Sequence, residues 1–241
     1  MSIEAIAAFL LISMVSALVQ STTGFGYGTI CMALLPYIMP NHLETVAICS
    51  LCTATTSTMA AVKGTKHAKK ELVIPLCVGF FIASAVSIFF AKKVENEILI
   101  KSLGIGLVAL SIYFMFYSGR IRIKPTFLNG VIAGALGGIG TGFLGIGSPP
   151  AVIYLMSATD DKNVYRSSSL AYFAIGSWYA SGVRVVNGIT NLRVITLWLM
   201  ALAALAVGTY IGSKLFDKIN AGLLTKIIYG FMAVSGVAML F

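Results

Sequence analysis

Long apolar runs, each close to 20 residues, constrain the fold of this chain more than any other feature. They cover residues 43–62, 71–91, 98–117, 167–186, 192–213 and 222–241. A helix needs about 20 residues to cross a hydrocarbon core. With 58% hydrophobic and only 10% charged residues, the chain has more apolar surface than a water-soluble fold can bury. We therefore predict an all-α, polytopic integral membrane protein, a single membrane domain over residues 1–241 in which these six runs cross the bilayer.

The charged and sulfur-containing residues agree with this class. Lys and Arg lie at the ends of the runs, as membrane topology requires, so the net charge of +9 does not indicate a nucleic-acid partner. Glu4 stands where a secretory signal would be basic, and we expect the first segment to be retained. All four cysteines lie inside apolar segments, where they behave as small buried hydrophobes: Cys31, Cys49, Cys52 and Cys77.

A glycine-rich motif occurs twice. Residues 17–29 read ALVQSTTGFGYGT and residues 135–148 read ALGGIGTGFLGIGS. Thr23-Gly24-Phe25 recurs as Thr141-Gly142-Phe143, and one inserted residue later Gly26-Tyr27-Gly28 recurs as Gly145-Ile146-Gly147. Three apolar spans follow each copy, and a basic connector separates the halves. The sequence therefore predicts two repeats, residues 1–119 and 126–241.

Each glycine-rich element is too long to be one straight transmembrane helix. The 35 residues from Ile3 to Tyr37 would extend about 52 Å as helix, well beyond a hydrocarbon core of about 30 Å. Glycine weakens a helix by about 1 kcal/mol per residue, and proline lacks the backbone donor. We predict breaks at Thr22 to Gly28 and at Gly137 to Pro150, each joining a helix to a second helix that returns to the side it came from.

The charge distribution supports this re-entrant topology. If both elements return, the loops 63–70, 118–125, 157–166 and 214–221 share one side with Lys226, and that side holds 12 of the 17 basic residues. The other side holds five, together with Glu4, Glu44, Glu95 and Glu97. The positive-inside rule then predicts a protein of the cytoplasmic membrane with both termini outside the cytoplasm and the two repeats inverted.

Inverted repeats with broken helices indicate a transport site near the bilayer midplane, where the two breaks are expected to face each other. Backbone N–H groups at the starts of the returning helices, with nearby hydroxyl and amide groups, form a site for an anion. In the alternative interpretation the glycines only allow close helix contacts. The candidate substrate-binding residues in the breaks are Gln20, Ser21, Thr22, Thr23, Gly24, Gly26, Gly28, Thr29, Thr141, Gly142, Gly145, Gly147 and Ser148.

Arg184, near the end of a span, is the remaining candidate. It could complete the anion site from outside, or it could snorkel and mark the membrane interface; Lys63 holds the comparable place in the first half. Arg166 and Lys162 stand beside two aspartates and are interpreted as part of a solvated loop. Two hydroxyl-rich runs, Thr53 to Thr58 and Ser167 to Ser169, could extend a polar path or bond to helix backbone.

Several residue patterns are missing from the sequence. No Asp or Glu falls in the middle of a span, and the chain has no nucleotide-binding loop and no catalytic constellation. Cys49 and Cys52 form a CxxC without a partner pair, so no metal site is expected. We predict a non-enzymatic carrier of a small anion, without cofactor or metal, in contact with lipid. An anion-selective channel and a membrane subunit that binds a partner protein are the alternatives, and the sequence leaves open whether the chain forms a homo-oligomer.

Residues 20–36, QSTTGFGYGTICMALLP, and 137–155, GGIGTGFLGIGSPPAVIYL, resemble the duplicated motif of the TauE/SafE family of membrane permeases. The resemblance extends over essentially the whole chain. It implies transport of sulfur-containing or related anions such as sulfite, sulfoacetate or thiosulfate, often outward, with Gly24, Gly26, Gly28, Gly142, Gly145 and Gly147 at the site. The chain departs from the triple glycine frequent in that family, because Tyr27 and Ile146 occupy the central positions.

Overall fold

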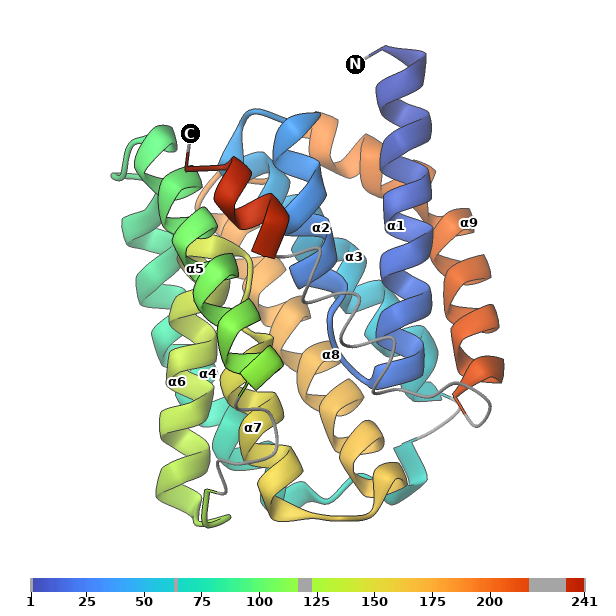
Figure 1. The fold of residues 1–241 in the computed structure, drawn as a ribbon, viewed down its shortest axis with the longest axis vertical. Helices are drawn as coiled ribbons and strands as arrows, with labels where there is room; N and C mark the ends of the chain where they lie inside the picture. The colour runs from blue at the N-terminus through green and yellow to red at the C-terminus, as the bar shows by residue number, and fades with distance from the viewer. Residues whose placement is uncertain (1, 63–64, 117–122, 217–232, 241) are drawn as a thin grey trace.

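The structure is a computed structural model that describes residues 2–62, 65–116, 123–216 and 233–240. These residues form helices, turns and short connections, and no strand occurs among them, which confirms the predicted all-α class. The labelled helices are α1 (Ile3–Thr23), α2 (Tyr27–Leu34), α3 (His42–Val62), α4 (Lys70–Ala91), α5 (Asn96–Phe116), α6 (Phe127–Leu144), α7 (Ser148–Ala158), α8 (Lys162–Val186) and α9 (Leu192–Leu215), with single 3-10 turns at Leu35–Tyr37 and Thr65–His67 (Figure 1). Residues 233–238 are also helical.

Six of the described helices are long and apolar enough to cross a membrane, namely α1, α3, α4, α5, α6 and α9. The chain is therefore a multi-pass membrane protein. These six helices are not all the same segments as the six apolar runs predicted to cross the bilayer. The first halves of the broken elements, α1 and α6, belong to the set, whereas α8 does not, because it carries several serines and two arginines. The run at 222–241 lies mostly outside the described residues, which include only its part at 233–240.

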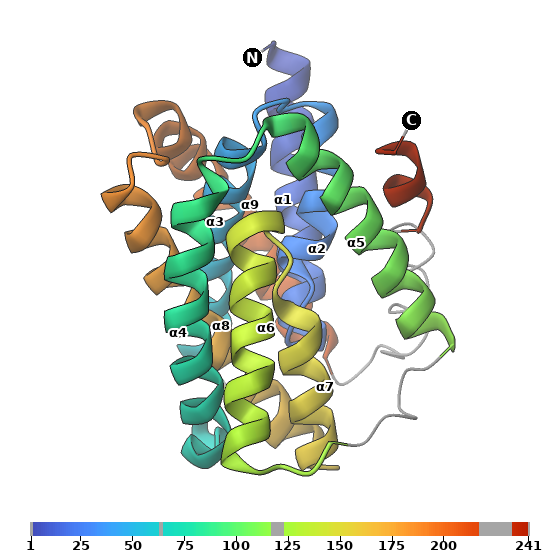
Figure 2. The same cartoon turned by 90° about the vertical axis from the view of Figure 1, so that its left-hand side faces the viewer.

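Both glycine-rich elements are broken, as predicted. Gly24 and Gly26 between α1 and α2 have φ values of 87° and 103°, and Gly145 between α6 and α7 has a φ of 71°. Only glycine takes these left-handed conformations at little cost. Figure 1 shows α1 descending from the N-terminus and α2 turning back, and Figure 2 shows α6 rising from the other end before α7 descends.

The breaks are shorter than predicted. Helix continues through Thr23 in the first element and through Leu144 in the second, so each break covers only three residues. The predicted limits of Gly137 to Pro150 were too wide for two reasons. Residues 137–144 stay helical because they pack against neighbouring backbone, and Pro149 and Pro150 lie in the first turn of α7, where a missing N–H costs no helical hydrogen bond.

The helices pack in pairs that connect the two halves of the chain. α4 packs along α6, α1 packs along α9, and α3 crosses beside α8 near the centre. α3 is the most enclosed of the candidate spans, with 78% of its window buried, against 33% for α1, α6 and α9. The site described below is built around α3 and α8, while the outer helices present large apolar side chains such as Ile82, Phe89 and Ile105.

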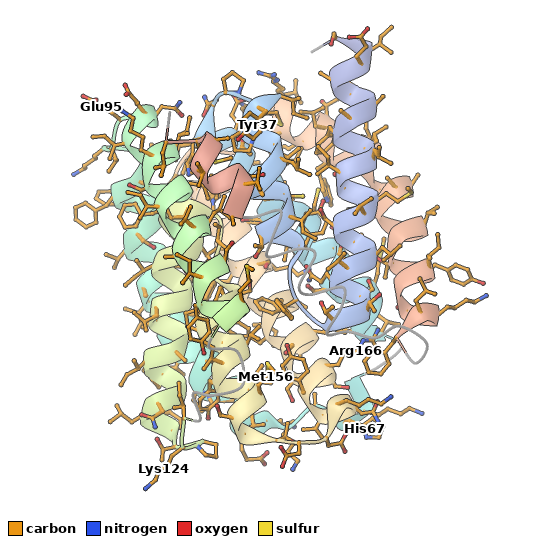
Figure 3. All side chains as sticks on the ribbon, in the orientation of Figure 1. Tyr37, His67, Glu95, Lys124, Met156 and Arg166 are labelled. Atoms are coloured by element: carbon orange, nitrogen blue, oxygen red, sulfur yellow. The ribbon has the colours of Figure 1, made fainter. Side chains whose placement is uncertain are left out.

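Figure 3 labels residues that mark the two ends of the bundle. His67 and Lys124 lie at one end, which we call the basic end, and Glu95 lies at the opposite, acidic end together with Tyr37 (Figure 3). α1 begins at the acidic end. Figure 1 shows the described parts of the loops that were predicted to share a side lying toward the basic end. Lys63, Lys226 and part of the 118–125 and 214–221 loops lie outside the described residues.

Candidate functional site

The two breaks meet inside the bundle. A Cβ atom added to Gly28 at the start of α2 would lie 2.8 Å from the carbonyl oxygen of Gly145 in the other break. The hydroxyl oxygens of Thr29 and Ser148, at the starts of the two returning helices, are 3.4 Å apart. Since these residues are more than 100 positions apart in the chain, the structure confirms the prediction that the breaks face each other.

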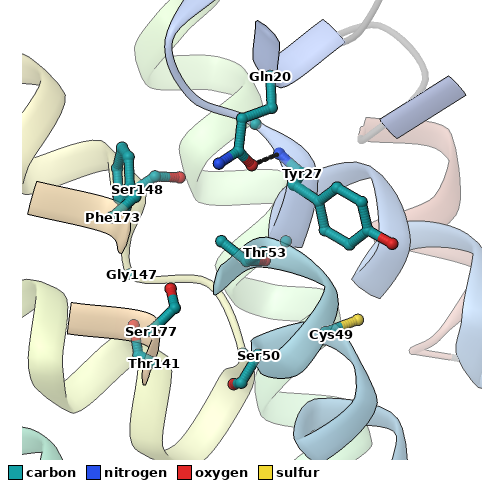
Figure 4. A pocket seen from close by; sticks show the side chains of 13 residues that line it. Gln20, Tyr27, Cys49, Ser50, Thr53, Thr141, Gly147, Ser148, Phe173 and Ser177 are labelled. Carbon is teal, nitrogen blue, oxygen red and sulfur yellow. Dashed lines mark hydrogen bonds between the residues drawn. The ribbon is translucent and has the colours of Figure 1, made fainter. Parts of the chain in front are cut away.

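A cavity of about 40 Å³ lies at this meeting point. That volume exceeds the roughly 10–15 Å³ that one water molecule needs, and it is small enough to suit a compact anion. Figure 4 shows side chains from α1, α2, α3, α6, α7 and α8 around it (Figure 4). The lining residues are Gln20, Gly26, Tyr27, Gly28, Cys49, Ser50, Thr53, Thr141, Gly145, Gly147, Ser148, Phe173 and Ser177. Seven of the fourteen predicted site residues are among them.

Gln20 is held in place by two hydrogen bonds. Its Oε1 accepts the backbone N–H of Tyr27 at 3.2 Å, and its Nε2 donates to the hydroxyl of Ser57 on α3. The side chain is 1% exposed. One amide group therefore ties the last turn of α1 to the first turn of α2 and to α3, and presents a polar edge to the cavity.

The two returning helices differ in the donors they bring. The first N–H groups of any helix lack acceptors within it and form the positive end of its dipole. In α2 the N–H of Tyr27 is engaged by Gln20, and the donors that follow belong to Gly28 and Thr29. In α7, Pro149 and Pro150 have no N–H, so Gly147 and Ser148 retain the donors of that first turn. Gly28, Gly147 and Ser148 line the cavity, and Thr29 lies next to Ser148.

Arg184 lies next to the cavity rather than at the membrane interface. Its side chain is 1% exposed; Nη1 donates to Ser50 Oγ at 2.8 Å, and Nη2 donates to the carbonyl oxygen of Thr141 at 2.7 Å. Both partners line the cavity. The snorkelling interpretation is therefore wrong for Arg184, because the guanidinium is enclosed by protein. Lys63, its predicted counterpart, lies outside the described residues.

Three predicted hydroxyl groups do not face the cavity. Ser21, Thr22 and Thr23 each donate to a carbonyl four residues earlier in α1, at 2.7, 2.8 and 2.9 Å. This is the ordinary way for a helical hydroxyl to satisfy itself in an apolar environment. They shape the end of α1, and the lining residues include none of the three.

Gly24 and Gly142, which match each other in the motif, also lie away from the cavity. A Cβ at Gly24 would meet Arg166 and Ser169 of α8, and one at Gly142 would fall 1.9 Å from Ser87 Oγ of α4. Gly142 continues a row of glycines that brings α6 against α4, which also includes Gly130, Gly134 and Gly138. For Gly142 the alternative interpretation, close helix packing, is the one the structure supports.

Arg166 differs from its predicted role in a solvated loop. It lies in α8, is half-buried, and donates from Nε to the carbonyl oxygen of Ser21 at 2.8 Å and also from Nη2 to the same atom. Its guanidinium carbon lies 4.4 Å from the centre of the Phe216 ring. The neighbouring aspartates misled the sequence interpretation, because Asp161 caps α8 instead of pairing with Arg166.

Five lining residues were not predicted from the sequence, namely Tyr27, Cys49, Ser50, Phe173 and Ser177, and Thr53 was expected only as part of a possible polar path. A signal for Ser177 was present in the sequence. Ser177, Ser181 and Arg184 follow an i, i+4, i+7 pattern and so form a polar stripe on one face of α8. Two other hydroxyls of the first run, those of Thr55 and Thr58, donate to backbone carbonyls of their own helix at 2.9 and 2.7 Å.

In the part of the chain that the structure describes, no three His, Cys, Asp or Glu side chains lie close enough together to hold a metal ion. Cys49 and Cys52 are both buried with free thiols. Among the lining residues there is neither a carboxylate nor a histidine. The cavity therefore offers hydroxyl, amide and backbone donors, with the positive charge of Arg184 behind them.

Comparison with known proteins connects this arrangement to a family. Neither the curated proteins nor the solved structures gave a match to the chain. A family model described as "Sulfite exporter TauE/SafE" matches residues 9–239, nearly the whole chain and both glycine-rich breaks. The chain therefore belongs to the TauE/SafE sulfite exporter family.

Proposed function

We propose that the protein transports a small sulfur-containing anion, of the sulfite, thiosulfate or sulfoacetate class, and that the cavity between the two breaks is its binding site. The observation that carries this proposal is the meeting of Gly28 with Gly145 and of Thr29 with Ser148, which places two helix starts around one polar cavity. The positive ends of two helix dipoles and a set of hydroxyl donors favour an anion.

The electrostatics of the cavity support an anion over a cation. Its lining includes no carboxylate, and the nearest guanidinium, Arg184, shares hydrogen bonds with two lining residues. The chemistry of sulfite and its relatives, compact oxyanions with several acceptor atoms, matches a site made mostly of donors. The family match supports the same substrate class.

We infer that the chain consists of two repeats, residues 1–119 and 126–241, in inverted orientation. The pairing of helices supports this inference. α1 of the first repeat corresponds to α6 of the second, and α4 corresponds to α9. The α1–α9 pair is therefore the counterpart of the α6–α4 pair, and the structure contains both pairs. The hairpins α1/α2 and α6/α7 also start from opposite ends of the bundle (Figures 1 and 2). Such symmetry suits alternating access around a fixed central site.

The proposed direction is export from the cytoplasm. The basic end, with His67 and Lys124, would face the cytoplasm by the positive-inside rule, and the acidic end with the start of α1 would face outward. A membrane potential that is negative inside favours the exit of an anion by about 2.3 kcal/mol per charge per 100 mV. Export therefore needs no coupling carboxylate.

Gln20→Glu tests the proposal directly. The replacement has the same shape and can still accept from Tyr27 N–H, but an ionised carboxylate would set a negative charge at the cavity edge. We expect wild-type protein in liposomes to take up ³⁵S-labelled sulfite and thiosulfate, and the variant to do so at least tenfold more slowly, since one unit charge at such short range changes anion affinity by more than 1.4 kcal/mol. Thr196→Val, on the exposed face of α9, is the control.

The result also separates the alternatives. Flux that saturates with substrate and stays below channel rates supports a carrier. Single-channel currents would instead identify the protein as an anion channel. The proposed function would be contradicted if wild-type protein in liposomes moved none of sulfite, thiosulfate and sulfoacetate under any gradient. Equal flux in wild-type protein and Gln20→Glu would place the binding site elsewhere.

A further inference from the structure

Arg166 and Arg184 occupy one face of α8 on either side of the cavity. They are 18 residues apart, which is five helical turns at 3.6 residues per turn, so both side chains leave α8 in the same direction and about 27 Å apart along the axis. The two cavity-lining residues of α8, Phe173 and Ser177, fall between them on that same face. Each is seven residues, about two turns, from the nearer arginine.

Each arginine holds the end of a different hairpin helix. Arg166 donates to the carbonyl oxygen of Ser21 in the last turn of α1, and its Cα and Cγ atoms lie against Gly24 in the first break. Arg184 donates to the carbonyl oxygen of Thr141 in the last turn of α6, next to the second break. Both carbonyls lie at the negative end of a helix dipole, where a guanidinium is stabilising.

The two contacts lie toward opposite ends of the molecule. Arg166 is in the part of the bundle nearer the basic end, as Figure 3 shows. The turn after Arg184 lies at the acidic end, where the carbonyl oxygen of Asn187 accepts from Lys92 and Asn191 donates to Glu44. Each side of the cavity therefore has one arginine that is bound to a helix end bordering a break.

We propose that Arg166 and Arg184 are paired gating residues, one for each side of the cavity. This inference rests on the proposed function, because gates presuppose a central anion site. A guanidinium prefers an oxyanion to a neutral carbonyl, because the oxyanion adds ion-pair attraction and can accept two parallel N–H···O bonds from the planar fork. An anion that arrives from one end binds the arginine on that side and weakens its bond to the hairpin carbonyl, while the other arginine keeps its own hairpin in place.

Cys49 provides a sided reporter of this gating. Cys49 is one of the residues that line the cavity and is 3% exposed, so a membrane-impermeant methanethiosulfonate reagent reaches it only when the cavity opens to the side of the reagent. The measurement uses full-length protein in liposomes of known orientation, with the reagent either outside or trapped inside. Cys49→Ser identifies the signal of this thiol among the four cysteines.

We expect Arg166→Gln to speed labelling of Cys49 severalfold from the basic end alone, and Arg184→Gln to do so from the acidic end alone. The charge of the reagent gives a second readout. Loss of an arginine should lower the ratio of labelling by the anionic sulfonatoethyl reagent to labelling by its cationic trimethylammonium analogue, by roughly tenfold from that side. A purely structural loosening would change both reagents alike.

Arg193→Gln is the matched control, since Arg193 pairs with Glu44 at the surface, and it should label like the wild type. Arg166→Lys and Arg184→Lys keep the charge but not the fork of donors. These lysine variants should leave the ratio of labelling by the anionic and cationic reagents unchanged, while labelling of Cys49 from their own side is still faster. They replace the glutamine variants in the test if a glutamine variant does not fold. Equal acceleration from both sides, or no acceleration from either, would overturn the gating proposal.

Labelling does not require transport of any particular anion, so the two proposals can fail separately. Sided labelling without sulfite or thiosulfate flux would keep the gates and reject the substrate class. Flux with unsided labelling would keep the transport function and reject the gates.

Discussion

The two hairpins reach the same broken geometry by different means. In the α1/α2 hairpin, polar side chains hold the break: Gln20 bonds to the N–H of Tyr27, and Thr23 accepts from and donates to the backbone of Phe25. In the α6/α7 hairpin, backbone packs on backbone. A Cβ at Gly137 would lie 2.7 Å from the carbonyl oxygen of Gly147, and one at Gly140 would lie 2.3 Å from that of Ile146.

The motif alignment shows the origin of this difference. Residues 19–22 read VQST, whereas the matching residues 137–140 read GGIG. The first hairpin thus supplies the amide and hydroxyl chemistry of the site, and the second supplies close approach. The neighbouring helices differ in the same way. α6 brings its own glycines to α4, but α1 meets glycines of its partner α9, Gly208 and Gly212.

Gly147→Ala should give the largest effect, because it adds an atom where the second hairpin has no space. The new Cβ would lie 1.9 Å from Thr141 Oγ1 and 2.1 Å from the carbonyl oxygen of Gly137. We expect a loss of about 3 kcal/mol in the free energy of unfolding, the upper range for overpacking, measured by denaturant titration in mixed micelles. Gly182→Ala, with open space around its Cβ, should instead stabilise α8 by about 0.5 kcal/mol.

Gly142→Ala tests whether the glycine row of α6 acts in packing. Its Cβ would overlap Ser87 Oγ at 1.9 Å, and we expect a loss of about 2 kcal/mol in unfolding free energy. Ser87→Gly in the same chain removes the overlapping atoms, so the double variant should be more stable than Gly142→Ala alone. A double variant that is less stable than either single variant would contradict the packing role.

Gly24→Ala is the matching change in the first hairpin and should cost less. The added Cβ would meet α8 at ordinary contact distances of 3.4–3.5 Å, so the cost comes from the left-handed φ of 87°. That strain is about 1 kcal/mol. If thermal unfolding shows Gly24→Ala to be as damaging as Gly142→Ala, the two hairpins do not differ as described.

The smallest effect should come from the contact between the hairpins. Thr29→Val and Ser148→Ala remove the two hydroxyls that lie 3.4 Å apart. In a double-mutant cycle we expect a coupling of about 0.5 kcal/mol, the low end for a hydrogen bond. A coupling of zero would show that shape alone, and not this contact, aligns the two breaks.

The duplicated motif and the apolar runs were enough to predict the breaks, their re-entrant form and their meeting. They were not enough to tell which members of the motif reach the cavity. Thr22 and Thr141 illustrate the limit: both are motif hydroxyl residues beside a break, yet Thr22 bonds to Leu18 and to Gly212 of α9, while Thr141 lines the cavity. Which way a helical hydroxyl points depends on the neighbour across from it, and that neighbour is nearly 200 residues away in the chain.

The sequence by itself determined the membrane class and the position of each break, because hydrophobic length and glycine content act locally along the chain. Only the tertiary structure decided the roles of the arginines. Arg166 stands among aspartates and Arg184 near a span end, and nothing local distinguishes them from solvated or interfacial residues. Five turns of α8 set both on one face, and the packing of α1 and α6 against that helix brings a carbonyl to each.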